Sequence, residues 1–310
     1  MKSRRLLVGS EADLLTGLTL NFGNLSPEDS HFDSSRVCVI PFPYEATTSY
    51  RGGTKDGPLA ILQASAQVEL YDDELDWSPY EVGIATTAPL WPSREDYDAP
   101  LRQLEETVDA ALSRGMFPVV LGGEHAITQG SVRAALKRFP NLVVLQIDAH
   151  ADLRQSYEET PYSHASAMAR IVDLGVPLVQ VGIRNISLDE MRWWREKQPS
   201  TIFWARDYCR GRHSVQEVLD AMGERPVFLT IDLDGLDPSV VPGVGTPEPG
   251  GLGWWETLEL LRGVFSQRQV IGCDVVELAP IPGQNVSEFA AAKLVYKLIG
   301  YKFDRQREGR

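Results

Sequence analysis

Short apolar segments alternate with longer helix-like segments along most of the chain, and this alternation restricts the fold more than any other feature. It is typical of a parallel sheet covered by helices, because consecutive parallel strands need a crossover connection. Several of the apolar segments lack a polar face, as strands buried on both sides do. The expected strands are residues 36–41, 117–121, 142–148, 178–182, 201–204, 227–232 and 272–277. The expected helices are residues 58–70, 96–113, 127–138, 165–174, 188–197, 214–222, 254–265 and 287–299.

Length and charge narrow the class of protein. The chain has 310 residues, enough for two domains or one large α/β domain, and a formal net charge of −13. An acidic balance argues against a nucleic-acid partner and is compatible with a cationic substrate. Three widely spaced cysteines indicate reduced thiols, and no apolar run is long enough to span a membrane. We therefore expect a cytoplasmic protein that binds neither nucleic acid nor membrane.

Charged and histidine side chains collect where four of the expected strands end. In parallel α/β sheets, ligands bind beyond the carboxyl ends of the strands, so residues at these ends can share one crevice. Residues two apart in an extended chain point the same way, which lets the members of each strand end project together. The residues concerned are Glu124, His125, Asp148, His150, Asp152, Asp232, Asp234 and Glu277.

Such a crevice would hold four aspartates and two histidines, which points to metal binding. Like charges at ~4 Å repel strongly at low dielectric, so clustered acids need cations between them. Six mostly oxygen ligands exceed the needs of one tetrahedral zinc and suit a pair of harder ions such as Mn²⁺. A calcium-binding EF-hand beginning at Asp232 is the specific rival, and it fails because Gly243 stands where the loop requires a bidentate glutamate.

Three motifs resemble the ureohydrolases, the family of arginases and agmatinases. They are GGEHAIT at 122–128, DAHADL at 148–153 and TIDLDGLDPSVVPGVGTPEPGGL at 230–252. The resemblance extends over about residues 37–301 and is strongest to agmatinase-type members. It implies a three-layer α/β/α sandwich around a mainly parallel sheet of about eight strands. We expect a single ureohydrolase domain over residues 1–310, with an N-terminal extension at 1–35 and a tail at 302–310.

The resemblance also implies a role for each motif residue. His164 matches the histidine that relays a proton, Glu277 the carboxylate that receives the guanidinium group, and Asp152 would orient the nucleophile. Thr246, in the third motif, is expected to bind substrate together with Glu277. The family implies two Mn²⁺ ions per subunit and a homotrimer or homohexamer. One ion would be held by His125, Asp148, Asp152 and Asp232, and the other by Asp148, His150, Asp232 and Asp234.

Departures from the arginase pattern concern the substrate. Glu124 and Ala126 stand where arginases carry Asp and Ser, and residues 153–157 (LRQSY) replace the Asn- and Ser-rich loop that grips an amino-acid head. We expect hydrolysis of agmatine to putrescine and urea, a step of polyamine synthesis. The segment LAPIPGQNVSEFAAAKL after Glu277 lacks the Pro-Tyr-Asp of many agmatinases. Alternatives are N1-aminopropylagmatine, guanidinobutyrate, free guanidine or a formimino substrate, as in formiminoglutamase, and a polyamine-binding scaffold without catalysis.

Two further features are expected to be structural. The acidic stretch at 69–76 is typical of a solvated face, and His31 and His213 lie in polar segments typical of the surface. The tryptophan pairs at 193–194 and 254–255 are expected to serve the core or subunit contacts.

Overall fold

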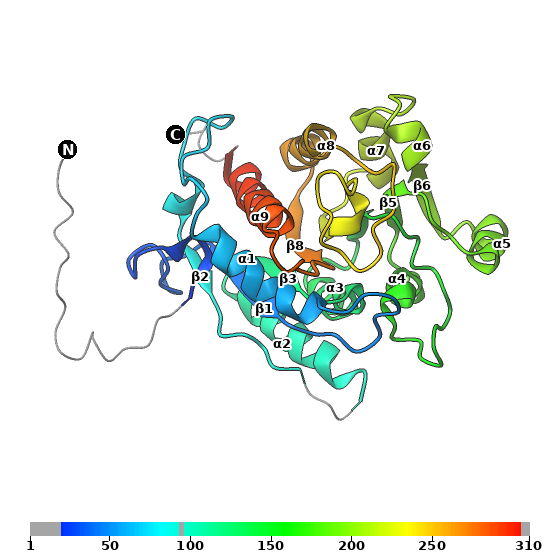
Figure 1. Ribbon diagram of the computed structural model, residues 1–310, viewed down its shortest axis with the longest axis horizontal. Helices are drawn as coiled ribbons and strands as arrows, with labels where there is room; N and C mark the ends of the chain where they lie inside the picture. The colour runs from blue at the N-terminus through cyan, green and yellow to red at the C-terminus, as the bar shows by residue number, and fades with distance from the viewer. Residues whose placement is uncertain (1–19, 93–95, 305–310) are drawn as a thin grey trace.

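Eight parallel strands form a single sheet in the computed structural model, which describes residues 20–92 and 96–304 (Figure 1). The strand order is β2-β1-β3-β8-β7-β4-β5-β6, and every neighbouring pair is parallel. The strands are β1 Val37–Phe42, β2 Ile84–Thr86, β3 Phe117–Gly122, β4 Val143–Ile147, β5 Leu178–Ile183, β6 Ser200–Trp204, β7 Val227–Asp232 and β8 Val270–Val276. Much of the expected extension at 1–35 and of the expected tail at 302–310 lies outside the described residues.

Helices cover both faces of the sheet, giving three layers. The α-helices are α1 Gly57–Ser65, α2 Ala99–Ser113, α3 Thr128–Leu136, α4 Ala167–Asp173, α5 Leu188–Lys197, α6 Ala205–Tyr208, α7 Val215–Met222, α8 Trp254–Gln267 and α9 Val286–Asp304. Short 3₁₀ helices are η1 Phe22–Asn24, η2 Thr54–Asp56, η3 Pro79–Val82, η4 His125–Ile127, η5 His164–Ser166 and η6 Leu233–Gly235. Helices α1, α7, α8 and α9 pack on one face, and α2, α3 and α4 pack on the other.

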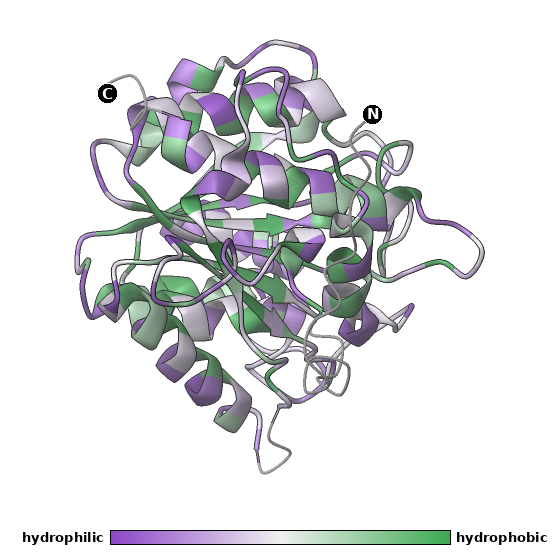
Figure 2. Ribbon diagram, turned by 90° about the vertical axis from the view of Figure 1, so that its left-hand side faces the viewer, coloured by the Kyte–Doolittle hydropathy of each residue, from purple (hydrophilic) through white to green (hydrophobic). Residues whose placement is uncertain are grey.

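The hydrophobic core lies between the sheet and these two helical layers. Strands β1, β3, β4, β5, β7 and β8 are buried at every position, which explains why they are apolar without alternation. Figure 2 shows hydrophobic strand segments lying between helices that carry hydrophilic residues on their outer sides. The predicted α/β fold with a mainly parallel sheet is therefore confirmed.

One strand was not predicted from the pattern of apolar residues. Strand β2 has only three residues, pairs with β1 alone and lies at the edge of the sheet. A segment this short is below the length at which a strand pattern can be recognised. The seven strands that were expected all form, and β2 brings the sheet to eight.

The acidic stretch at 69–76 differs from the expected solvated face. Glu69, Asp73 and Asp76 are exposed, but Asp72 is fully buried and Glu74 is half-buried. Lys297 of α9 reaches both of the latter, with its Nζ 2.7 Å from Asp72 Oδ1 and 2.9 Å from Glu74 Oε2. The stretch therefore fastens the segment before β2 to helix α9, and the burial of Asp72 is explained by this ion pair.

The remaining expectations concern single residues. Cys38 and Cys273 are buried and Cys209 is half-buried, and all three are free thiols. His31 is exposed, whereas His213 is half-buried with its ring edge-on to Phe203. None of the helices within 20–92 and 96–304 is both long enough and apolar enough to cross a membrane.

The ion pair of Lys297 supplies a test of the fold. In Lys297→Met, the Asp72 carboxylate keeps its buried position without a cation, and we expect the free energy of unfolding to fall by roughly 3 kcal/mol. Lys293→Met, on the same helix but half-buried, is the matched control and is expected to change it by less than about 0.5 kcal/mol. Urea unfolding followed by circular dichroism measures both. Equal midpoints for the two variants would show that the buried pair does not hold α9.

Candidate metal centre

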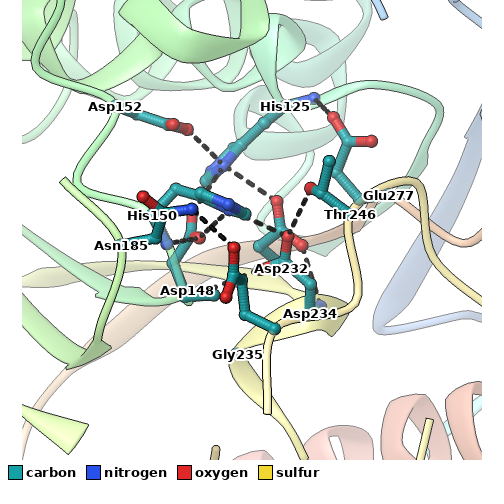
Figure 3. A network of polar contacts seen from close by, with 12 residues as sticks. His125, Asp148, His150, Asp152, Asn185, Asp232, Asp234, Gly235, Thr246 and Glu277 are labelled. Carbon is teal, nitrogen blue, oxygen red and sulfur yellow. Dashed lines mark hydrogen bonds and ion pairs between the residues drawn. The ribbon is translucent and has the colours of Figure 1, made fainter. Parts of the chain in front are cut away.

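Four neighbouring strands in the middle of the sheet carry the site at their carboxyl ends. His125 follows β3 in η4, Asp148 follows β4, Asp232 ends β7 and Glu277 follows β8 (Figure 3). These strands lie side by side in the order β3-β8-β7-β4, so the topology brings together residues from distant parts of the sequence. The register of parallel pairing places their last residues at one level of the sheet edge.

A glycine allows the loops of this edge to approach one another. Gly235 closes η6 directly against the chain at Asp148, where an added Cβ would lie 2.7 Å from the Asp148 backbone nitrogen. Only glycine fits that distance without moving β4 or β7. The DLDG sequence at 232–235 therefore does more than supply carboxylates, because its glycine sets the separation between the aspartates of β7 and β4.

The first ligand group surrounds the ring of His125. Its Nδ1 lies 3.0 Å from Asp148 Oδ2, 3.0 Å from Asp152 Oδ2 and 3.3 Å from Asp232 Oδ2. This Nδ1 is fully buried and makes no hydrogen bond, while Nε2 is 2.8 Å from the hydroxyl of Thr230. One ring nitrogen cannot serve three carboxylate oxygens at once, and a buried nitrogen facing converging oxygens is the arrangement of ligands around a cation.

The second ligand group shares Asp148 with the first. His150 Nδ1 lies 3.0 Å from Asp234 Oδ2 and 3.6 Å from Asp148 Oδ1. Ligand atoms of His125, Asp148 and Asp152, and separately of Asp148, His150 and Asp234, lie within 4.8 Å of one another. Two ions placed in these groups would have Asp148 between them. The further role of Asp232 as a second bridging ligand stays a prediction.

Backbone and side-chain donors fix the carboxylates in these positions. The His150 N–H donates to Asp148 Oδ1 at 2.5 Å, and the Asp234 N–H donates to Asp232 Oδ1 at 2.9 Å. Gln146, on β4, donates through Nε2 to Asp148 Oδ2 at 2.6 Å. These partners orient the oxygens before any ion binds, as donors around ligand carboxylates do in metal sites.

The aspartates and histidines of the site shift one another's pKa values, as clustered charged groups do. Burial opposes the charged form of His150, but Asp234 and Asp148 outweigh it and raise its pKa to about 12. Burial and the charge of Asp148 raise the pKa of Asp152 to about 7. Burial also raises the pKa of Asp232 well above its usual range, with Asp234 and Asp148 adding to the effect. The carboxylates thus favour positive charge between them, which divalent ions would supply.

Two of the carboxylates stand on unusual backbone. Asp152 has φ 52° and Glu277 has φ 66°, in the left-handed region that residues other than glycine seldom adopt. Glu277 accepts a hydrogen bond from the His125 N–H at 2.7 Å, and burial, followed by the charge of Glu124, raises its pKa well above the usual range. Strained backbone at two acidic positions of one crevice is typical of a functional site.

His164 and Thr246 line the same pocket as the metal ligands. Thr246 lies 3.4 Å from Asp234 through its hydroxyl, close enough to contact a group bound beside the ligands. Burial, with His150 and His125, lowers the pKa of His164 to about 4. The ring of His164 is therefore neutral at pH 7 in this pocket.

All the residues proposed from sequence for the site are brought together, and the structure gives two other motif residues, Glu124 and Thr230, partners that the sequence does not indicate. Glu124 is fully buried and accepts hydrogen bonds from the segment before α1, and burial raises its pKa to about 7 against these bonds. Thr230, two residues before Asp232, holds the far nitrogen of His125. The alternation along β7 could have placed Thr230 on the same side as Asp232, but nothing in the sequence pairs it with His125.

Comparison with known proteins identifies the family. The family model described as "Arginase family" matches residues 35–300. The chain is 46% identical over 283 residues to the N(1)-aminopropylagmatine ureohydrolase of Synechocystis sp., a match that covers 89% of this chain and 92% of the relative. It is 34% identical to the agmatinase of Bacillus anthracis, with 86% and 92% covered.

Solved structures give the same result. The crystal structure of agmatine ureohydrolase of Thermoplasma volcanium superposes with a TM-score of 0.86 at 28% identity, covering 97% of this chain and all of that one. Sequence family and fold therefore agree over nearly the whole described chain. The chain therefore belongs to the arginase family and is a hydrolase of the ureohydrolase type.

Proposed function

We propose that the protein hydrolyses the guanidino group of a cationic alkylamine to urea and the corresponding amine, with two Mn²⁺ ions per chain. The observation that supports it most is the pair of ligand groups joined by Asp148, with Glu277 and His164 facing the same pocket. The donor set of carboxylate oxygens with one imidazole in each group fits harder divalent ions such as Mn²⁺.

The residues divide the reaction between them. A pair of divalent ions bound here would supply hydroxide at neutral pH, by lowering the pKa of water. Glu277 would hold the guanidinium through charge-assisted hydrogen bonds, since a cation beside this buried carboxylate favours its ionised form. Asp152 would accept a hydrogen bond from the nucleophile and so orient it. His164, neutral at pH 7, would take up a proton and pass it to the departing amine.

The walls of the pocket favour an amine at the far end of the substrate. Both arginines that line the pocket are already engaged. Arg51 donates to the carbonyl of Pro280 at 2.8 Å, and Arg154 lies over the ring of Tyr157 with its Nε 3.7 Å from Glu190 Oε2. An anionic end, as in guanidinobutyrate or arginine, would compete with these contacts for the two guanidinium groups.

The relatives refine the choice among amines. Agmatine is the substrate we expect from the motifs, and N1-aminopropylagmatine is the alternative that the name of the Synechocystis relative favours. We propose N1-aminopropylagmatine as the preferred substrate, with spermidine and urea as products, and agmatine as the second. A homotrimer or homohexamer in the cytoplasm remains part of this proposal.

A substrate panel tests the function directly. With Mn²⁺ added, we expect urea from N1-aminopropylagmatine with a kcat/KM at least about ten times that for agmatine, and little from arginine or guanidinobutyrate. Urea and the product amine are measured together by mass spectrometry. Binding of spermidine or agmatine without urea from any guanidino compound would contradict hydrolysis and favour a polyamine-binding scaffold.

Two substitutions separate metal binding from proton transfer. His164→Ala is expected to lower kcat by about 100-fold or more while the protein retains its metal, because His164 belongs to neither ligand group. Asp232→Ala is expected to lose metal together with activity. Metal content after gel filtration distinguishes the two, and equal loss of metal in both variants would refute the assignment of His164.

Metal loading is expected to release protons. His150 carries a proton in the metal-free protein, because its pKa is about 12, and a histidine must give up that proton to bind an ion. His125, whose pKa is also raised by Asp148, Asp152 and Asp232 against its burial, adds to the effect. At pH 7 we expect the binding of Mn²⁺ to release at least two protons per chain, because the ligands Asp152 and Asp232, whose pKa values are also raised, add to the two histidines. The release is measured with a pH indicator in weak buffer. His150→Ala is expected to release about one fewer, and binding without proton release would contradict the ligand assignment.

A further inference from the structure

We propose that Thr47, held by the buried carboxylate of Glu124, is a positioning residue that fixes the orientation and the tautomer of His164. This inference rests on the proposed hydrolysis, because it explains how His164 is prepared to accept a proton. Thr47 lies in the loop between β1 and η2, and no motif of the chain includes it. The three residues are far apart in the sequence and meet only in the folded protein.

Glu124 forms the fixed end of this arrangement. It directly precedes η4, and its side chain is fully buried. Its Oε2 accepts the backbone N–H groups of Ala46 at 2.8 Å and Thr47 at 2.7 Å. Its Oε1 accepts the hydroxyl of Thr47 at 2.9 Å. Three donors from one short segment leave the carboxylate little freedom, so it determines where the Thr47 hydroxyl lies.

The hydroxyl of Thr47 contacts His164 at two atoms. Thr47 Oγ1 lies 3.1 Å from the backbone nitrogen of His164 and 3.1 Å from its Nδ1. Among residues 20–92 and 96–304, the one other contact of Nδ1 that approaches hydrogen-bonding distance is with Ser163 Oγ, at 3.4 Å. Since Thr47 is 5% exposed, water does not compete freely for these contacts. The side of the ring that carries Nδ1 is therefore anchored to the wall of the pocket.

Counting hydrogens then assigns the tautomer. A threonine hydroxyl has one hydrogen to donate and two lone pairs to accept with. The Thr47 hydroxyl donates its hydrogen to Glu124 Oε1 at 2.9 Å, so Thr47 Oγ1 can only accept from His164. The backbone N–H fills one lone pair and an Nδ1–H fills the other. A neutral His164 must then carry its proton on Nδ1, which leaves Nε2 bare.

The bare Nε2 is the nitrogen that the proposed reaction needs. His164 lines the pocket together with His125, Asp152 and Glu277. The ring of Tyr157 stands edge-on to the imidazole, with ring centroids 5.9 Å apart and planes at 81°, and limits its rotation. With Nδ1 engaged on the wall, Nε2 is the position at which a proton can be gained and passed on. Loss of the Thr47 hydroxyl would allow the other tautomer, whose Nε2 already carries a proton.

The first experiment compares Thr47→Val with Thr47→Ser in the manganese-loaded enzyme at pH 9. Valine keeps the shape of threonine without its hydroxyl, and serine restores the hydroxyl. We expect Thr47→Val to lower kcat by about 10- to 100-fold with KM changed less than about twofold, and Thr47→Ser to remain within about threefold of wild type. Thr107→Val, on the outer part of α2, is the control for threonine substitution and should change neither parameter.

A double variant separates positioning from a structural effect. If Thr47 acts only through His164, Thr47→Val should cost nothing further in a His164→Ala background. Metal content of every variant should equal that of wild type. A similar fall of kcat in both backgrounds, or loss of metal in Thr47→Val, would overturn the proposal.

The second experiment reads the tautomer without relying on turnover. The chain has five histidines, and ¹⁵N-labelled imidazoles can be observed by NMR in protein loaded with diamagnetic Zn²⁺, with His164 identified from the spectrum of His164→Ala. We expect wild type at pH 9 to show protonated Nδ1 and bare Nε2, and Thr47→Val to show a mixture. A protonated Nε2 in wild type, or identical spectra for the two proteins, would overturn the proposal. Should wild type release no urea from any substrate, the proposed function would fail, and the spectra would still decide whether Thr47 sets the tautomer.

Discussion

Repulsion among the aspartates at the carboxyl edge of the sheet is the constraint on which the rest of the site depends. Two like charges ~4 Å apart repel by about 4 kcal/mol at the effective dielectric of a protein, and this edge holds four such groups within one crevice. The strands hold them there because β3, β8, β7 and β4 are buried on both faces and cannot move apart. The fold thus stabilises an arrangement of charge that requires cations, whether protons on histidine or divalent ions.

The sequence predicted this edge well because its information is local. A recognisable strand precedes Asp148, His150 and Asp152, which are spaced two residues apart, and another precedes Asp232 and Asp234 with the same spacing. Because side chains two apart in an extended chain point the same way, the spacing and the strand ends together predict where these residues lie. The same reasoning failed for Asp72, whose partner Lys297 lies 225 residues away. It also failed for β2, which is too short to show a pattern. Contacts between distant segments depend on packing that neither composition nor periodicity records.

Thr47 and Glu124 belong to this second kind of information. The GGEH motif places Glu124 beside a metal ligand, and from sequence the glutamate is no more than a departure from the aspartate of arginases. Its partner Thr47 lies 77 residues before it in the sequence. His164, the histidine that Thr47 and Glu124 orient, lies 117 residues after Thr47. Ligand motifs therefore identify the class of reaction, whereas the groups that prepare a proton carrier become visible only in the fold.

The difference between residues at strand ends and residues in loops explains why the sequence indicates the type of reaction more clearly than the substrate. The ligands end rigid strands, so their geometry follows from the sheet and is common to proteins that share it. The far end of the pocket is formed by the loop containing Arg51 and by the segment of Arg154 and Tyr157, which regular structure does not position. There the choice between an amine and a carboxylate depends on whether each arginine already has a partner. In this chain Glu190, the Tyr157 ring and the Pro280 carbonyl contact those two guanidinium groups. In the proposed function, these contacts compete with a carboxylate end of the substrate and so disfavour it.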